Sequence, residues 1–538
     1  MRRAAFATML LSLAACSGAG TSSGVPSPGF DSRDDRVLIS TFSDVEGVAV
    51  SDRYLFAVSG QSLAIHERRF RQWLQPHRLE DRFFRGAVEL MAADPLEEAV
   101  WIASSGRVLY VRVFPPSEVS ALVPGVPGAI VFDARNPSSG AFVYTTAGWT
   151  QVSRTGAAFR VGGNQVPPAG QRIVASSLRD VLDRYPSLRN FAPMLTRDGT
   201  NRSWPIVAGS IAPNETEVWL GTRGGGLFRV DPVFNRSEQV EYGLLDEGAG
   251  ALAGAGDDVL VAGLGLPGSR GGLTHFTGDL QRWRWLESNP LRPLANARTF
   301  SMDVFGDVAW LATDRGVARV DLRDADNVRL FTTSRGLPAQ EALSVAATAD
   351  GAWVGTAQGL VFVSADAVSQ PLGDNAPVRA LALAGDTLWV GTERGLLALS
   401  PAVATSSLRR PAAATSELRL TQPIRALALA DTVLAVVTER DLLYVDRRSG
   451  AVTPSAAATR PSVIGAISAA SADASTIWVT GQRGVIIFQR GSALTRVLSA
   501  PGHIPGAAFD VLLDPGWAWI ATREGVLRLR RTTDGMPR

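Results

Sequence analysis

Four histidines are the first side chains to consider for chemistry, because imidazole can act as a general base or bind a metal near neutral pH. They are His66, His77, His275 and His503. None lies two or four residues from another, and no carboxylate motif accompanies them, so the sequence supports neither a zinc site nor a nucleophile–base pair. His503, in the turn APGHIPG, is retained as a candidate residue on a ligand-binding face.

A second pattern consists of arginines that recur just after the motif W-x-G-T and its variants. They are Arg223, Arg315, Arg394, Arg440, Arg483 and Arg523. An arc of guanidinium groups could bind carboxylate or phosphate groups through paired hydrogen bonds. Several of these arginines adjoin acidic residues, so the alternative is an arc neutralised by its own neighbours, which contributes little energy in water. The chain has no lysine, so a lone arginine carries little functional information.

The N-terminus carries the only cysteine, Cys16. Residues 1–15 begin with two arginines and continue with a short apolar run, which predicts a secretion signal rather than a permanent membrane span. The residues LAAC (13–16) resemble the bacterial lipobox, and this resemblance implies cleavage before Cys16 and its acylation. An ordinary cleaved signal is the alternative. Residues 16–35 are expected to be the acylated cysteine and a flexible Gly/Ser/Pro tether. Ser17 resembles the outer-membrane sorting pattern, so we expect a lipid-anchored envelope protein.

The elements that position the arginines recur with a period of about 40 residues. About eleven units can be recognised, and the clearest are 217–231, 308–322, 351–364 and 387–400. Each unit reads as an apolar strand, a polar turn, a strand opening with an aromatic or large apolar residue, a tight turn ending in glycine and a third apolar strand. A more polar fourth segment leads into the next unit. Four short antiparallel strands per repeat are typical of a β-propeller blade.

The segment FTTSRGLPAQEALSVAATADGAWVGTAQGLVFV (331–363) resembles the two-component regulator propeller repeat. The resemblance covers most of 37–530 and implies an all-β fold of propeller blades. In that family, propellers form the outer sensing part of membrane histidine kinases. This sequence contains no recognisable kinase or DNA-binding module, so only the fold is carried over.

Propellers usually contain four to eight blades. Eleven units therefore predict two rings, for example five plus six or four plus seven, with a single large ring as the alternative. We assign residues 36–290 to the N-terminal blades and residues 291–538 to the C-terminal blades. The repeat breaks between about 152 and 205, where Val174, Leu178, Val181, Leu182 and Tyr185 follow helical spacing up to Pro186. This helical insert is expected to be a cap on its own ring, or alternatively a docking helix for a partner.

Tryptophans at equivalent strand positions admit two interpretations. They are Trp101, Trp219, Trp310, Trp353, Trp389, Trp478 and Trp519. Sugars stack on indole rings, but a tryptophan at the same place in successive repeats is better explained by packing between neighbouring blades.

These observations predict a non-catalytic binding scaffold in the cell envelope. The net charge of +2 in 538 residues gives no excess of charge for nucleic acid. No cofactor or metal motif is recognised. The expected partner is a protein or a polysaccharide, in addition to the membrane that the lipid anchor would reach. The alternatives are an extracellular sensor subunit and a propeller enzyme, a lyase or glycosidase, that acts on a polysaccharide.

Overall fold

The computed structural model describes residues 35–79, 87–104, 106–372, 375–400, 416–418 and 420–538. Within them the chain forms eleven antiparallel sheets, most of four strands, and two short α-helices. The all-β fold of about eleven blade-like units is therefore confirmed. Cys16, the predicted signal and nearly all of the predicted tether lie outside the described residues. No helix in the described ranges is long and apolar enough to span a membrane.

Seven sheets follow one another along the second half of the chain. Their strands are β20 (Ala249–Ala255), β21 (Asp258–Gly263), β22 (Leu273–Thr277), β23 (Trp283–Leu286), β24 (Thr299–Phe305), β25 (Val308–Thr313), β26 (Gly316–Asp321), β27 (Val328–Phe331), β28 (Ala342–Thr348), β29 (Gly351–Thr356), β30 (Gly359–Ser364), β31 (Val378–Ala384), β32 (Thr387–Thr392), β33 (Gly395–Leu399), β34 (Ser416–Leu418), β35 (Ala426–Ala430), β36 (Val433–Val437), β37 (Leu442–Asp446), β38 (Val452–Pro454), β39 (Ile467–Ala472), β40 (Thr476–Gly481), β41 (Gly484–Gln489), β42 (Thr495–Ser499), β43 (Ala508–Leu513), β44 (Trp517–Thr522) and β45 (Gly525–Arg530). The fourth strand of the last sheet is β1 (Arg36–Ile39), which pairs with β45.

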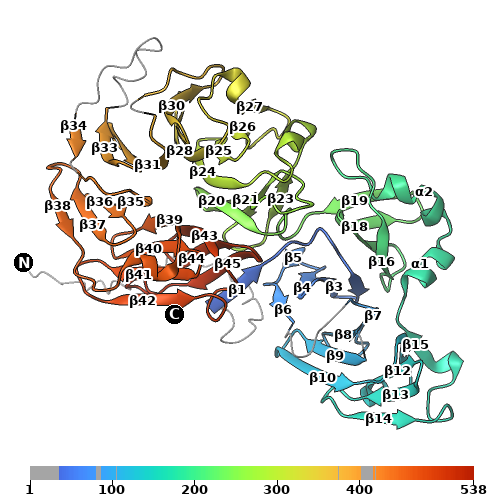
Figure 1. Ribbon diagram of the computed structural model, residues 1–538. Coiled ribbons are helices and arrows are strands. Elements are labelled where there is room, and N and C mark those ends of the chain that lie inside the picture. The colour runs from blue at the N-terminus through green and yellow to red at the C-terminus, as the bar shows by residue number, and fades with distance from the viewer. Residues whose placement is uncertain (1–34, 80–86, 105, 373–374, 401–415, 419) are drawn as a thin grey trace, which may run out of the picture.

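The first strands of these seven sheets line a common centre. β20, β24, β28, β31, β35, β39 and β43 contact one another in that order, and β43 in turn contacts β20. We call this seven-sheet unit the circuit, and Figure 1 shows its sheets arranged around the centre. Because β1 comes from the start of the described chain, the last sheet contains strands from both ends of that chain.

Four further sheets precede the circuit. Their strands are β2 (Gly47–Val50), β3 (Tyr54–Ser59), β4 (Ser62–Glu67), β5 (Gln72–Trp73), β6 (His77–Arg78), β7 (Leu90–Ala93), β8 (Ala99–Ser104), β9 (Arg107–Arg112), β10 (Ser117–Leu122), β11 (Pro127–Asp133), β12 (Ala141–Thr145), β13 (Gly148–Val152), β14 (Ala158–Val161), β15 (Arg172–Val174), β16 (Ile206–Ile211), β17 (Val218–Thr222), β18 (Gly226–Asp231) and β19 (Arg236–Val240). Their inner strands contact in the order β16, β2, β7 and β11, with no comparable contact from β11 to β16 among the described residues. We call this unit the arc (Figure 1).

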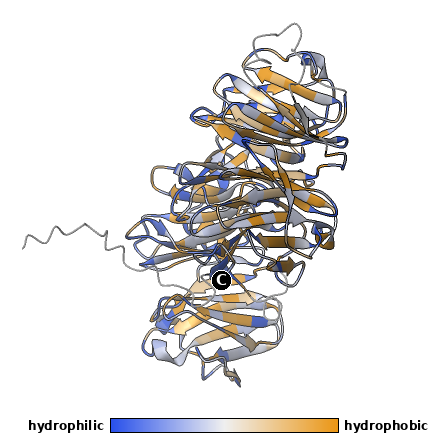
Figure 2. Cartoon of the chain, turned by 90° about the vertical axis from the view of Figure 1, so that its left-hand side faces the viewer, coloured by the Kyte–Doolittle hydropathy of each residue, from blue (hydrophilic) through white to orange (hydrophobic). Residues whose placement is uncertain are grey.

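Blade packing explains the repeated apolar strands. A sheet with neighbours on both faces buries every side chain of its middle strands, and β29, GAWVGT, is buried along its whole length. The seven equivalent tryptophans are at most 4 % exposed, which confirms packing as their role. In Figure 2 apolar colouring follows the strands, whereas the connecting loops are more hydrophilic.

The helical insert differs from the expectation in detail. Val174 belongs to β15, where it pairs with Val131 of β11, and does not extend the helix. The first helix, α1 (Leu178–Arg184), begins after Ser177, whose side chain forms a capping box with Asp180. A second helix, α2 (Ser187–Leu195), follows Pro186 directly.

The expected division between blade groups near residue 290 stays a prediction. The inner-strand contacts group the sheet of β20–β23 with the six later sheets, because β20 contacts both β24 and β43.

Candidate functional site

The turns between the second and third strands of the circuit sheets carry five of the predicted arginines. Strand direction alternates in the same way in every sheet, so these turns lie on one face of the circuit, which we call the arginine face. Its exposed turn arginines are Arg315, Arg394, Arg440, Arg483 and Arg523. Arg223 occupies the corresponding turn between β17 and β18, which belongs to the arc. The structure thus brings five of the six together.

A threonine at the end of the second strand fixes the shape of most of these turns, though not of the turn that carries Arg483. The hydroxyl of Thr313 donates to the carbonyl of Gly316 at 2.8 Å and accepts from the Arg315 amide at 3.1 Å. Two sheets further along the chain, Thr392 makes the same two contacts, at 2.9 Å and 3.1 Å. Because the hydroxyl satisfies two backbone groups, the motif holds the arginine backbone in place and leaves its side chain at the surface.

Two arginines on the inner strands join the arginine face and were missed by sequence reasoning. Arg379 is the second residue of β31, and Arg425 directly precedes β35. Glu393 accepts from both of them, with a distance of 2.8 Å from Arg425. Arg425 also donates to Glu439 at 2.7 Å. Burial would raise the pKa of Glu393, but the two arginines outweigh it and hold that pKa below its ordinary value. The available signal was the repeated pair VRALALA and IRALALA, in which an arginine opens an apolar strand.

The inner strands enclose a channel of about 510 Å³. Half of its lining residues are alanine or serine, and the charged ones are Asp303, Asp510, Arg379 and Arg425. Asp510 accepts from the amides of Leu252 and Val511, both at 2.8 Å, and so links β43 to β20. Asp303 links β24 to β28 in a similar way, through the Ala347 amide at 2.8 Å. Burial raises the pKa of Asp303, and it raises the pKa of Asp510 to about 7.

The histidines each have local neighbours rather than a shared site. His503 is exposed in the loop between β42 and β43, with Nδ1 3.0 Å from the Ser499 hydroxyl. His77 lies 2.8 Å from Glu118, and His275 lies 2.8 Å from Asp258. Across the described residues, no three side chains of the metal-binding types gather at one place.

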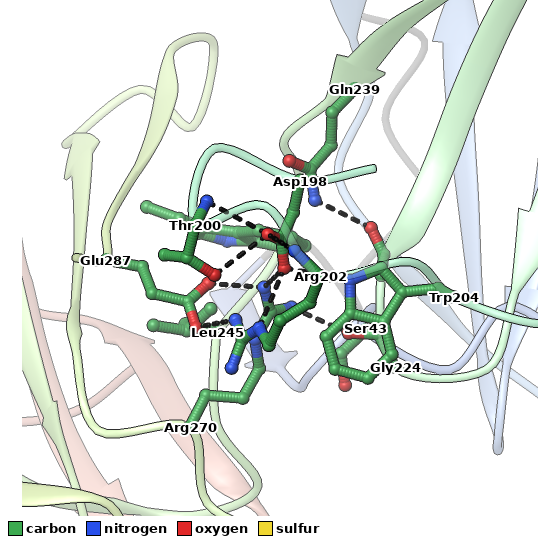
Figure 3. Close-up of polar contacts among 12 residues, drawn as sticks. Ser43, Asp198, Thr200, Arg202, Trp204, Gly224, Gln239, Leu245, Arg270 and Glu287 are labelled. Carbon is green, nitrogen blue, oxygen red and sulfur yellow. Dashed lines mark hydrogen bonds and ion pairs between the residues drawn. The ribbon is translucent and has the colours of Figure 1, made fainter. Parts of the chain in front are cut away.

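A buried charged network joins the arc to the circuit (Figure 3). Asp198 and Arg202 follow α2 in the arc, whereas Arg270 and Glu287 lie in circuit loops. Asp198 accepts from Arg202 at 3.0 Å and from Arg270 at 3.2 Å. Glu287 accepts hydrogen bonds from both arginines, and its Oε1 lies 3.1 Å from Nε of Arg270. The side chains of Arg270 and Glu287 are only 6 % and 9 % exposed.

An indole completes this network. The Trp204 ring lies 5.0 Å from the guanidinium of Arg202 and 4.9 Å from that of Arg270, and its N–H donates to Asp198 at 2.9 Å. Trp204 packs on the Gly224–Gly225 turn, where a Cβ at Gly224 would come within 2.2 Å of the ring. Burial lowers the pKa of Arg270 to about 10. Burial would raise the pKa of Asp198, but its hydrogen bonds and Arg202 outweigh this and lower it. These groups satisfy one another, so the network is a joint between the two units.

No protein-family model and no curated protein matches the chain. Among solved structures, the chain is similar to PorZ, a bacterial surface component of the type-IX secretion system of Porphyromonas gingivalis. That likeness has 11% identity and a TM-score of 0.49, and it covers 92% of this chain and 87% of PorZ.

Two further solved structures illustrate the range of similar proteins. One is an extracellular domain described as that of a hybrid two-component system, BT4673 from B. thetaiotaomicron, with 12% identity, a TM-score of 0.40 and coverage of 92% of this chain and 71% of that one. The other is virginiamycin B lyase from Staphylococcus aureus, with 10% identity, a TM-score of 0.42 and coverage of 53% of this chain and 96% of that one. Neither likeness bears on the site, and the resemblance of the repeats to a particular propeller family stays a prediction.

Proposed function

We propose that the chain is a lipid-anchored envelope protein that acts as a non-catalytic binding scaffold, with the arginine face of the circuit as its ligand-binding face. The observation that carries this proposal is the gathering of exposed arginines around one end of the channel. Five come from turns of circuit sheets, and Arg379 and the partly exposed Arg425 add two at the start of inner strands. Guanidinium groups bind carboxylates and phosphates in a defined geometry, so the ligand is an anionic group on a protein or a polysaccharide.

The acidic residues of this face favour a preorganised surface over a neutralised one. Glu393 and Glu439 are engaged by the inner-strand arginines Arg379 and Arg425. These carboxylates therefore orient the inner guanidinium groups. The turn arginines on the outer side are exposed.

The test uses a short poly-L-glutamate as the carboxylate probe and the triple variant Arg315→Ala, Arg394→Ala, Arg440→Ala. We expect the variant to bind the probe at least tenfold more weakly, and the wild-type affinity to fall with rising salt because exposed charges are screened. The matched control is Arg323→Ala, Arg448→Ala, Arg490→Ala, which removes three arginines from turns between third and fourth strands, on the opposite face. Calorimetry measures both. Equal losses in the two variants, or no binding by the wild type, would refute the arginine face as the ligand site.

The anchor is tested separately. Cys16→Ser should release the protein from the membrane fraction of cells, because acyl chains on Cys16 would be the only attachment proposed. Fractionation followed by immunoblotting measures this. An unchanged membrane fraction would contradict the anchor without affecting the binding test.

A further inference from the structure

The two ends of the arc are covered differently. At one end, the outer face of the β16–β19 sheet is covered by α1 and α2. Val181, Leu188 and Leu195 of these helices are at most 2 % exposed and pack on Leu220 and Phe228. At the other end, the outer face of the β11–β15 sheet packs on little more than Val166 from a loop.

Strand register identifies the side chains on this uncovered face. Val131 of β11 lies opposite Phe142 of β12, and Tyr144 of β12 lies opposite Trp149 of β13. Further out, Gln151 of β13 lies opposite Phe159 of β14. Alternation along each strand sends these residues to one side. The other side of the sheet, which includes Ile130 and Phe132, packs on the β7–β10 sheet.

Large apolar side chains are exposed on this face to an unusual extent. Phe159 is 62 % exposed, Val174 54 % and Tyr144 46 %, and the Tyr144 and Trp149 rings lie 5.0 Å apart. These three are among the 18 exposed large hydrophobic side chains of the described residues. Contiguous exposed apolar surface of this kind marks an interaction site.

The rim of this face is positively charged. Arg135 follows β11 and Arg172 opens β15 opposite Asp133, with the Arg172 guanidinium 5.4 Å from the Trp149 ring. Neither arginine forms an ion pair with a carboxylate among the described residues. Residues 127–174, which span β11 to β15, contain four arginines and one acidic residue, a net charge of +3, whereas the whole chain carries +2.

We propose that this uncovered face of the β11–β15 sheet, which we call the open face, binds an apolar, acidic segment of a partner polypeptide. The apolar side chains of this segment cover the apolar centre of the open face. The segment thereby takes the place of the neighbouring sheet that the β11–β15 sheet lacks, as α1 and α2 do at the other end of the arc. The arginine rim requires carboxylates beside the apolar side chains of the occupant, because like charges would oppose docking. The open face is separate from the arginine face, so either can fail without the other.

The experiment measures fluorescence anisotropy of two labelled ten-residue peptides with the full chain. One peptide alternates valine with glutamate, and the other alternates valine with arginine. We expect the glutamate peptide to bind at least tenfold more tightly. Phe159→Asp should weaken the binding of the glutamate peptide at least tenfold, because it places a negative charge at the apolar centre of the open face. The control is Phe305→Asp, which changes a side chain that is 50 % exposed on the circuit and should leave binding unchanged. Circular dichroism and melting confirm that both variants fold.

Four outcomes would overturn the proposal. The first is the absence of peptide binding, and the second is equal affinity for the two peptides. The third is binding to phosphatidylglycerol vesicles that Phe159→Asp abolishes, which would assign the open face to the membrane. The fourth is self-association in sedimentation velocity that Phe159→Asp abolishes, which would assign it to a second copy of the chain.

Discussion

The circuit and the arc are built from the same kind of sheet, but they solve the problem of covering it differently. In the circuit each sheet has two neighbours, so a residue such as Trp310 is 2 % exposed. In the arc the two terminal sheets have one neighbour each. The chain covers one of them with α1 and α2 and leaves the other largely open. A blade is therefore not self-sufficient: it needs a neighbouring sheet, a helical cap or a partner.

The joint between the units differs again from the packing within them. Sheets of the circuit are held together by apolar clusters, whereas the arc is attached both by packing of Trp283 on Tyr242, beside Trp73, and by the charges of Asp198, Arg202, Arg270 and Glu287. Apolar packing tolerates small shifts, but a buried ion pair requires a defined geometry. The network therefore fixes the orientation of the arc on the circuit.

The largest expected difference concerns one tryptophan in each of the two units. Trp310→Ala should destabilise the protein by about 4 kcal/mol, because it leaves a cavity between two packed sheets. Trp149→Ala on the open face should cost about 1 kcal/mol, because one side of that ring already faces solvent. Urea unfolding followed by circular dichroism measures both. Similar losses for the two variants would show that the open face is as well packed as the circuit.

The joint provides the next effect in size. Glu287→Gln should destabilise the attachment of the arc by about 3 kcal/mol, because it leaves the buried Arg270 and the partly buried Arg202 with Asp198 as their single ion-pair partner among the described residues. We expect one cooperative urea transition in the wild type and two in the variant, with the arc unfolding first. The matched control, Glu238→Gln, removes a pair with Arg229 in which Glu238 is 64 % exposed, and it should cost less than about 1 kcal/mol. A single unshifted transition in Glu287→Gln would contradict the joint.

Local patterns explain what could be predicted from sequence. The blade strands, the buried tryptophans and the turn arginines recur at fixed positions in each repeat, because each depends on contacts within one sheet or with the next. Thr313 and Gly316, for example, close their turn through a bond between residues three apart. Such features repeat along the chain and can be read from it.

Features that depend on non-local contacts could not be predicted. Asp198 and Arg270 are separated by 72 residues, and no local motif indicates that they meet. The pairing of Arg425 with Glu393 requires the positions of two adjacent sheets. The open face was missed for the same reason, since its strands resemble those of any other blade and only the missing neighbour distinguishes it.

The last expected effect is a difference in pH dependence within the circuit. The pKa of Asp510 is raised to about 7 by burial, so the folded state binds a proton that the unfolded state releases near pH 4. Stability should therefore fall as pH rises from 4 to 7, by at most about 1.4 kcal/mol per pH unit, and then level off.

Asp510→Asn should flatten this slope. It should also be less stable than the wild type at pH 5, because the amide cannot accept from both Leu252 and Val511. The two proteins should then converge toward pH 8. Urea midpoints across this range measure the slope, and Asp307→Asn, at an exposed carboxylate, is the control. If the wild type and Asp510→Asn keep the same slope, the channel carboxylate does not hold a proton near neutral pH, and its hydrogen bonds between β43 and β20 serve only to brace the circuit.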